Sequence, residues 1–270
     1  MRRLLPALFF FLAIHPAHAA TRFVQEPQDE ACRLWEEAEQ ALMSGKLDGH
    51  AAQVRFKALW PQVVVDDLPS PKEKHWQWMF PLPGHDASAY GESYNPEDYR
   101  YLDGPKAKGY PALRIYLRDS SREGLDERTH KPAPVVSASD GVVVSAWKFW
   151  KEGDVNPYGN YVLVLNQQDK MLFYYANLAK LRVSVGQLVD KGELLGWLGR
   201  TGKDVNDLHL GTQLRFEVHT FDGGLFYPVY PGRALRIAGQ AEWPMKDGEV
   251  HPRLKPPKVT PGMLTETTQD

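Results

Sequence analysis

Polar side chains that could do chemistry alternate with apolar ones along residues 212–218, which read Thr-Gln-Leu-Arg-Phe-Glu-Val. In a β-strand, alternate side chains lie on the same face. Gln213, Arg215 and Glu217 are therefore predicted to share one face of a strand, while the three apolar residues next to them face the core. A guanidinium on such a face can bind an acidic ligand or form an ion pair within the protein.

A second stretch, residues 109–117, has the same alternation and reads Gly-Tyr-Pro-Ala-Leu-Arg-Ile-Tyr-Leu. Tyr110 and Arg114 are predicted to share one face with Ala112 and Tyr116, opposite three apolar residues. If Arg114 and Arg215 converge, they form a cationic spot suited to a carboxylate. The alternative is an internal salt bridge, for example to Glu217 or Asp119.

These stretches belong to an ordered set of short motifs that spans about residues 80–232. The set resembles the zinc endopeptidases related to lysostaphin, the LytM or M23 family. The resemblance implies a mainly β fold for residues 69–240, an antiparallel sheet with a barrel-sandwich-like core. The motifs are Phe80–Leu82, Gly109–Tyr116, Asp126–Thr129, Ser139–Val143, Gly159–Val162, Tyr175–Leu178, Val185–Val189, Gly199–Gly202 and Thr212–Val218.

The resemblance also assigns roles to positions, and this chain departs from the family pattern at each of them. The family's first zinc motif, His-x-x-x-Asp, aligns with Tyr110 and Arg114, and its last zinc-binding His aligns with Arg215. Its two catalytic His positions are Asn177 and Gln213. The resemblance therefore implies a degenerate domain without zinc or catalysis. Its altered cleft would be lined by Tyr110, Arg114, Asn177, Gln213, Arg215 and Glu217.

The chemistry of arginine supports the loss of zinc. Zinc binds neutral His, thiolate or carboxylate donors, whereas a guanidinium has no lone pair to offer and stays protonated. At about 4 Å a guanidinium would repel a divalent cation by roughly 8 kcal/mol, even at an effective dielectric constant near 20. The alternative is an atypical zinc metalloendopeptidase that cleaves peptidoglycan cross-bridges with a relocated ligand set. Its candidate ligands are Asp119, His130, His209, Glu217 and His219.

The start of the chain has the features of an export signal. Arg2 and Arg3 precede a short apolar run and the sequence Ala17-His18-Ala19, so residues 1–19 are predicted to be a cleavable signal peptide. We expect a periplasmic or secreted protein without a membrane span, because the apolar run is shorter than the roughly 20 residues a span needs. The net charge of −2 and the absence of a long basic run disfavour nucleic-acid binding. The single cysteine, Cys32, cannot form an intrachain disulfide.

Around the β domain, we expect a helical hairpin within residues 20–68 and a proline-rich, disordered tail at residues 241–270. The first helix has apolar residues at helical spacing, and Glu36, Glu37 and Glu39 are predicted to lie on its other side. Within the β domain, residues 161–165 and 171–175 flank a polar turn and read as a hairpin.

The resemblance implies a regulator or binding module in peptidoglycan remodelling, because degenerate relatives in the family activate peptidoglycan amidases. The expected partner is peptidoglycan or a cell-wall hydrolase such as an amidase. A third reading is a lipoyl- or biotinyl-type carrier domain, since residues 183–192 share the Val-x-x-Gly-x-x-Val-x-Lys-Gly pattern of such domains. The modifiable Lys at a hairpin tip that such a carrier needs is not evident.

Overall fold

The helical hairpin is present as predicted. A computed structural model describes residues 21–63, 78–85, 90–91, 94–206 and 210–240. Helix α1 spans Gln28–Met43, and helix α2 spans Gly49–Leu59 and continues into the 3₁₀ helix η1, Trp60–Gln62. Asp48 caps α2 by accepting hydrogen bonds from the backbone N–H groups of His50 and Ala51. The predicted signal peptide and tail, residues 1–19 and 241–270, lie outside the described residues, as does the segment 64–77.

The β domain is an antiparallel sheet, which confirms the predicted fold class. Its strands run in the spatial order β1-β10-β7-β8-β9-β12-β3-β2, and β11, β6 and β13 pair off this path. The strands are β1 (Arg22–Phe23), β2 (Tyr90–Gly91), β3 (Ala112–Tyr116), β6 (Pro134–Val136), β7 (Gly141–Trp147), β8 (Asn160–Asn166), β9 (Met171–Leu181), β10 (Gln187–Val189), β11 (Leu194–Leu198), β12 (Gln213–Asp222) and β13 (Leu225–Val229). The hairpin predicted at residues 161–175 is β8 with β9.

Smaller elements surround the sheet. Strands β4 (Leu125–Asp126) and β5 (Lys131–Pro132) form a separate two-stranded hairpin. The 3₁₀ segment η3 (Tyr101–Lys106) packs on both helices of the hairpin. Helices α3 (Lys203–Asn206) and α4 (Gly232–Gln240) complete the described elements. None of the helices that the structure describes has the length and apolarity needed to cross a membrane.

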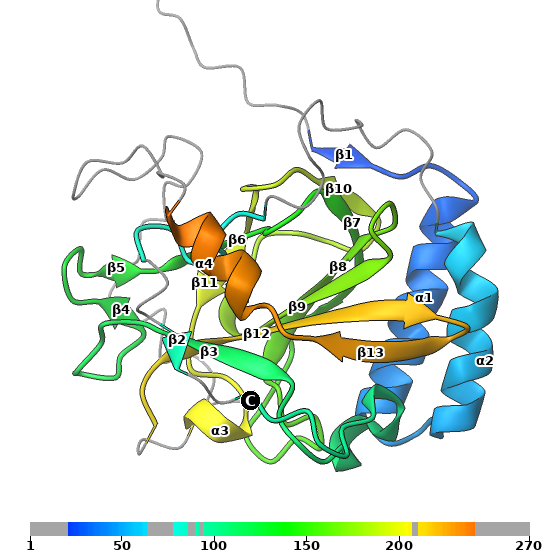
Figure 1. The fold of residues 1–270 in the computed structure, drawn as a ribbon, viewed down its shortest axis with the longest axis horizontal. Coiled ribbons are helices and arrows are strands. Elements are labelled where there is room, and N and C mark those ends of the chain that lie inside the picture. Colours follow the sequence, from blue (N-terminus) through cyan, green and yellow to red (C-terminus); the bar gives the residue numbers. More distant parts are fainter. Residues whose placement is uncertain (1–20, 64–77, 86–89, 92–93, 207–209, 241–270) are drawn as a thin grey trace, which may run out of the picture.

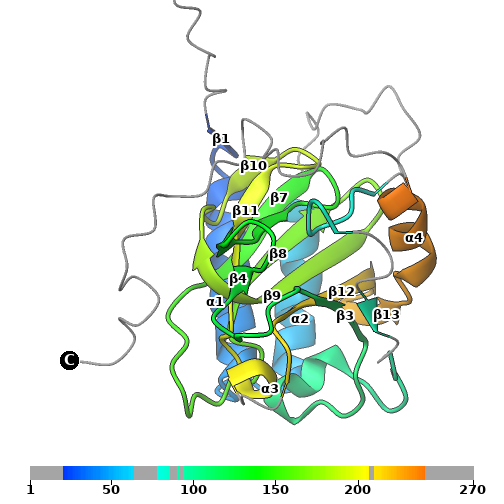
Figure 2. The same cartoon turned by 90° about the vertical axis from the view of Figure 1, so that its left-hand side faces the viewer.

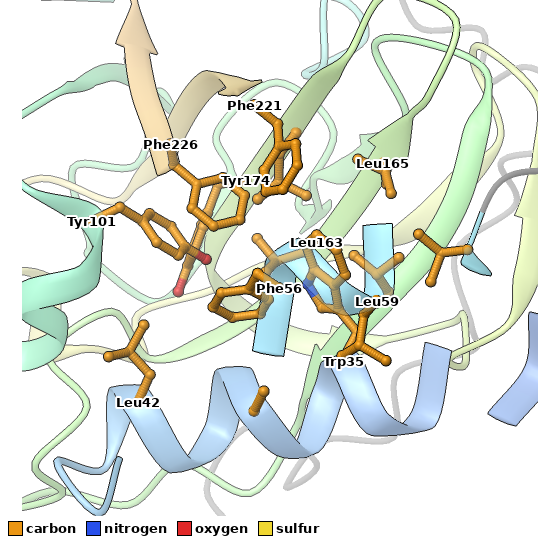
Figure 3. Close-up of a cluster of buried hydrophobic side chains, with 14 of the residues drawn as sticks. Trp35, Leu42, Phe56, Leu59, Tyr101, Leu163, Leu165, Tyr174, Phe221 and Phe226 are labelled. Carbon is orange, nitrogen blue, oxygen red and sulfur yellow. The ribbon is translucent and has the colours of Figure 1, made fainter. Parts of the chain in front are cut away.

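The hairpin α1–α2 covers one face of the sheet (Figures 1 and 2). Trp35 is fully buried at the centre of this contact, and its ring lies 4.8 Å from that of Phe56 and 6.1 Å from that of Phe226, centroid to centroid (Figure 3). The other face packs a second core that includes Leu214 and Phe216. Because both faces of the sheet are covered, the hairpin is part of the folded unit and not a separate appendage.

Strand β12 connects the two regions that matter for function. Leu214, Phe216 and Val218 lie in the second core, as the alternation predicted. On the opposite face, Gln213, Arg215, Glu217 and His219 form a buried polar row. The row ends at Phe221, which lies in the core beneath the hairpin. One face of one strand therefore runs from the predicted site to the helices.

Candidate functional site: an arginine cluster at the metal positions

The two arginines of the predicted site face each other on neighbouring strands. Strands β3 and β12 are antiparallel, and their register places Arg114 directly opposite Arg215. The guanidinium carbon of each arginine lies 4.4 Å from the centre of the Tyr110 ring. The Nε–H of Arg114 also donates a hydrogen bond of 3.1 Å to the Tyr110 hydroxyl. The structure thus brings Tyr110, Arg114 and Arg215 together.

Arg215 is held within the protein by a carboxylate and a second aromatic ring. Its Nε–H donates to Oε1 of Glu217 over 2.5 Å, and its guanidinium carbon lies 4.3 Å from the centre of the Tyr158 ring. The Arg215 side chain is 8% exposed and that of Glu217 is 2% exposed, so solvent screens this ion pair little. The internal salt bridge considered as an alternative is therefore present, between Arg215 and Glu217. We call Tyr110, Arg114, Tyr158, Arg215 and Glu217 the arginine cluster.

The pKa shifts follow from this pairing. Burial alone would raise the pKa of Glu217, but the charge of Arg215 and the hydrogen bond from His219 outweigh it, so the pKa is lowered. Burial alone would lower the pKa of Arg215, but the charge of Glu217 and the neighbouring tyrosines together outweigh it, so that pKa is raised. Both groups are therefore ionised at neutral pH. The pair must be treated as one unit, since each charge is stabilised by the other.

The polar row continues from the cluster to helix α1. Nε2 of His219 lies 3.0 Å from Oε2 of Glu217, and because a carboxylate can only accept, Nε2 carries the proton. The His219 ring packs against those of Tyr99 and Tyr101, at centroid distances of 5.8 and 5.2 Å. The Tyr101 hydroxyl in turn donates to Oε2 of Glu39 over 2.7 Å.

The position of Glu39 corrects the sequence prediction that it lies on the solvent side of α1. Glu39 is fully buried because η3 covers that side of the helix and Tyr101 supplies a hydrogen-bond donor. Glu36, predicted on the same side, is half-buried and accepts a hydrogen bond from the backbone N–H of Ala146. Burial and, to a smaller extent, the charge of Glu217 raise the pKa of Glu39 to about 8, although the hydrogen bond from Tyr101 partly offsets them. Of the three predicted glutamates, only Glu37 is exposed.

Gln213 lies two residues before Arg215 on β12 and is fully buried. Among the described residues, neither Oε1 nor Nε2 of its side-chain amide has a hydrogen-bond partner. An amide group buried without a partner costs roughly 1–3 kcal/mol. The buried amide of Gln213 therefore lowers the stability of an otherwise well-packed sheet. Tyr116, which lies directly opposite on β3, is 36% exposed, so this end of the face reaches the surface.

Asn177, the other position aligned with a catalytic His, serves the backbone. Its Nδ2 donates to the carbonyl oxygens of Tyr158, at 3.2 Å, and Thr201, at 2.8 Å. Its φ of 67° lies in the left-handed region, which Asn tolerates better than most residues. Asn177 thus fixes the loops next to the arginine cluster, and one of these loops carries Tyr158.

The residues of the proposed relocated zinc site are dispersed. Asp119 accepts hydrogen bonds from its own loop and from Thr212, and His130 is exposed beside the β4–β5 hairpin. Glu217 and His219 belong to the buried row, and His209 lies outside the described residues. In the part of the chain that the structure describes, no three His, Cys, Asp or Glu side chains lie close enough together to hold a metal ion.

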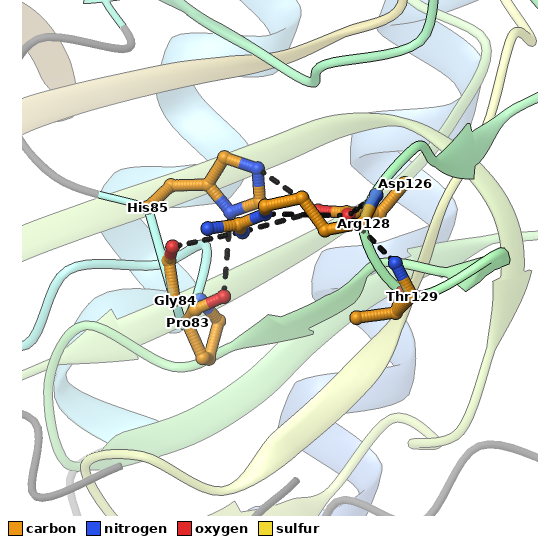
Figure 4. Close-up of polar contacts among 6 residues, drawn as sticks. All are labelled: Pro83, Gly84, His85, Asp126, Arg128 and Thr129. Carbon is orange, nitrogen blue, oxygen red and sulfur yellow. Dashed lines mark hydrogen bonds and ion pairs between the residues drawn. The ribbon is translucent and has the colours of Figure 1, made fainter. Parts of the chain in front are cut away.

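A second buried His–carboxylate contact lies away from β12. Nε2 of His85 is 3.4 Å from Oδ2 of Asp126, and Arg128 donates to both Asp126 and the carbonyl of Gly84 (Figure 4). This contact does not have the geometry of a hydrogen bond, and Nε2 of His85 has no hydrogen-bond partner among the described residues. Backbone N–H groups of Arg128 and Thr129 also donate to Asp126. This cluster fastens the β4–β5 hairpin to the preceding loop.

Tyr110, Arg114 and Arg215, which the resemblance aligns with the family's zinc positions, do not have the donor chemistry that a zinc ion needs. Two of the three are guanidinium groups, which cannot donate a lone pair, and the third is a phenol stacked between them. The chemistry that guanidinium groups offer is charge-assisted hydrogen bonding to acceptors such as carboxylates, and Arg215 already forms such a bond with Glu217. The sequence analysis missed Tyr158, which comes from the loop before β8, where no periodic pattern marks a residue as facing the site.

Comparison with known proteins finds a likeness to one family over part of the chain. Residues 120–226 match the description Peptidase family M23. A stretch of 94 residues is 35% identical to the cell division protein DipM of Caulobacter vibrioides, over 35% of this chain and 14% of that protein. A stretch of 98 residues is 31% identical to the glycyl-glycine endopeptidase ALE-1 of Staphylococcus capitis, over 36% of this chain and 25% of that protein. Residues 120–226 are therefore similar to the domain of peptidase family M23.

A solved structure, the antimicrobial peptidase lysostaphin from Staphylococcus simulans, aligns with 22% identity and a TM-score of 0.39, over 57% of this chain and 52% of that one. The chain spans no more than a quarter of the length of the two curated relatives. The matched segment includes Asn177, Gln213 and Arg215, whereas Tyr110 and Arg114 precede it. Those two residues are placed in the site by the pairing of β3 with β12.

Proposed function

We propose that this protein is a non-catalytic M23-domain protein of the periplasm that regulates or binds the machinery of peptidoglycan remodelling. The observation that carries the proposal is the arginine cluster. Arg114 and Arg215 face each other at positions where the family pattern has zinc ligands, and Arg215 is neutralised by Glu217 inside the fold. Without a bound metal, the domain would lack both the Lewis acid and the activated water that hydrolysis by this family requires.

The retained fold supports a role in binding. The cores on both faces of the sheet are intact, and the face that carried the changes is filled by a connected polar row. A domain that had lost its function entirely would have no reason to keep paired charges buried, because an apolar pair of similar volume is often equally stable. We infer that the partner is peptidoglycan or a cell-wall hydrolase such as an amidase.

Digestion of purified sacculi tests the proposal. Sacculi are incubated with the protein alone, with a purified peptidoglycan amidase alone, or with both proteins, and the soluble fragments are measured. We expect no release by the protein alone, with or without added zinc, and a several-fold increase in release by the amidase. An active M23 endopeptidase serves as the positive control. Release by the protein alone that a chelator abolishes would instead establish the atypical metalloendopeptidase.

Sedimentation with sacculi separates the two kinds of partner. Binding to sacculi without an effect on the amidase would identify a wall-binding module. An effect on the amidase without binding to sacculi would identify a regulator that acts on the amidase itself. If the protein neither binds sacculi nor affects the amidase, the proposed function is contradicted.

A further inference from the structure

The starting observation is the outer face of the helical hairpin, which is the side turned away from the sheet (Figure 1). Helices α1 and α2 lie side by side there, and each has one large apolar side chain exposed near its middle. Leu34 of α1 is 39% exposed, and Val54 of α2 is 57% exposed. Ala58 lies one turn beyond Val54 and is exposed as well. The hairpin therefore has apolar side chains on both its inner and its outer face.

The charges of the hairpin are separated between its two helices. Arg55 and Lys57 are the charged residues of α2, and both are exposed, which gives this helix a formal charge of +2. Glu36 and Glu39 of α1 turn inward. The remaining charged residues of α1 are three acidic ones and one basic one, a net charge of −2: Asp29, Glu30, Glu37 and Arg33. In the part of the chain that the structure describes, neither Glu37 nor Lys57 has an ion-pair partner.

The packing inside the hairpin fixes which residues of the two helices are level. The rings of Trp35 and Phe56 are in contact, with centroids 4.8 Å apart, so these two residues mark the same height. Since the helices run in opposite directions, Glu37 is level with Val54, and Lys57 lies three residues, or about 4–5 Å, further along the axis. A two-fold rotation about an axis parallel to the helices lays α1 of one copy over α2 of another without changing these heights. That operation brings Glu37 within reach of Lys57 of the partner subunit.

We propose that the outer face of the hairpin binds the same face of a second copy of this chain, as a two-fold symmetric dimer. Helix α1 of each subunit lies on α2 of the other, so that the acidic helix meets the basic one twice. Leu34 then packs beside Val54 of the partner subunit, and Glu37 pairs with Lys57 of the partner subunit. The opposite charges fix the orientation, because the other two-fold rotation would set α1 against α1, with like charges facing each other.

The separation of charge favours a second copy over other occupants. An anionic lipid surface or an acidic protein would attract α2 but repel the acidic α1 beside it, whereas a second copy offers both signs in matching order. The helices are only 16 and 11 residues long, so we expect a weak and reversible dimer that dissociates at the low concentrations of a denaturation experiment. No residue of the arginine cluster takes part, so the inference is independent of the proposed function.

Sedimentation equilibrium of the purified protein over a range of concentrations tests the proposal. We expect a reversible monomer–dimer equilibrium, and at least tenfold weaker association for Val54→Asp. The matched control is Val155→Asp, because Val155 is 61% exposed in the loop between β7 and β8, outside the hairpin, and this variant should associate like the wild type. Wild-type protein that stays monomeric at the highest concentrations overturns the proposal. Equal association of Val54→Asp and the wild type, or an equal loss in both variants, also overturns it.

A charge exchange tests the orientation of the two copies. Glu37→Lys and Lys57→Glu each place like charges across the proposed interface, so each variant alone should associate at least tenfold more weakly than the wild type. An equimolar mixture of the two variants should recover dimers to near the wild-type level, because each copy then meets the opposite sign. A mixture that stays monomeric, or single variants that dimerise like the wild type, rules the arrangement out. Both positions are exposed, and unchanged melting temperatures of the monomers show that the variants are folded.

Discussion

Replacing Glu217 with Gln removes one charge from the most deeply buried ion pair of the site. The substitution keeps the shape of the side chain, and the new amide oxygen can still accept from Nε2 of His219. What it removes is the negative charge 2.5 Å from Nε of Arg215, which stays protonated. In the variant, the buried guanidinium of Arg215 would therefore be surrounded by aromatic rings and a neutral amide.

The size of the effect follows from burial. The Arg215 and Glu217 side chains are 8% and 2% exposed, so neither charge is compensated by water. Removing one partner of a buried pair typically costs about 3–5 kcal/mol. The rings of Tyr110 and Tyr158 stabilise the guanidinium in both proteins and do not replace the lost charge. We expect the free energy of unfolding of Glu217→Gln to fall by about 3 kcal/mol or more.

Urea denaturation at neutral pH measures this quantity, with Glu37→Gln as the matched control on the exposed side of α1. The control is expected to change stability by less than about 0.5 kcal/mol. Replacing both partners, Arg215→Met with Glu217→Leu, should be less destabilising than Glu217→Gln alone, because it leaves no unpaired charge. A loss below about 1 kcal/mol for Glu217→Gln would refute the reasoning, because the pair would then be exchanging with solvent.

The same carboxylate predicts an acid dependence. Its folded-state pKa is lowered, so its contribution is present above the usual pKa of a glutamate and is lost as pH falls through the folded pKa. The stability difference between wild type and Glu217→Gln should therefore shrink below about pH 4. A difference that stays constant as the pH falls would contradict the shift.

Three further predictions concern the surroundings of the site. The pKa of Glu39 is raised to about 8, so its stabilising contribution is full at acid pH and is lost as pH rises through 8. In urea titrations, Glu39→Gln should therefore lose less stability between pH 5 and pH 8 than the wild type does. An equal loss in both proteins would count against the raised pKa. Trp35→Ala should cost about 3–5 kcal/mol by the same measurement, because the ring is fully buried between hairpin and sheet, and a loss under 1 kcal/mol would mean the hairpin is not docked. Asn177→Ala should lower the melting temperature by several degrees, since it removes two hydrogen bonds and places Ala in a left-handed conformation; an unchanged value would contradict the role of Asn177 in the loops.

The alternation of side chains along single strands could be predicted from the sequence. The pattern Gln-Leu-Arg-Phe-Glu-Val fixed which residues of β12 face the core, and the same pattern in residues 112–116 placed Arg114 on the polar face of β3. The convergence of Arg114 and Arg215 required only that these two strands pair in that register. The helical hairpin was predictable from the spacing of apolar residues and from the turn at Ser44-Gly45, where Gly45 has a φ of 71°.

Contacts supplied by loops could not be predicted in this way. Tyr158 reaches Arg215 from the loop before β8, and Tyr101 reaches Glu39 from η3, which is 62 residues away along the chain. A glutamate on a helix is ordinarily exposed, so nothing local marked Glu39 as buried. The close approach of η3 to α1 depends on Gly104, whose φ is 56° and where a side chain would meet the carbonyl oxygen of Leu42. That contact is a property of the folded chain as a whole.

The most direct test of the central claim is the zinc content of the purified protein. Mass spectrometry of the metals in protein prepared without chelators, then dialysed against zinc and washed, gives the number of zinc ions per chain. As a positive control, the triple variant Tyr110→His, Arg114→Asp and Arg215→His restores the family's ligand types at three positions and should gain zinc. Our account predicts far less than one zinc per chain in the wild-type protein, and one tightly held zinc per chain would contradict it.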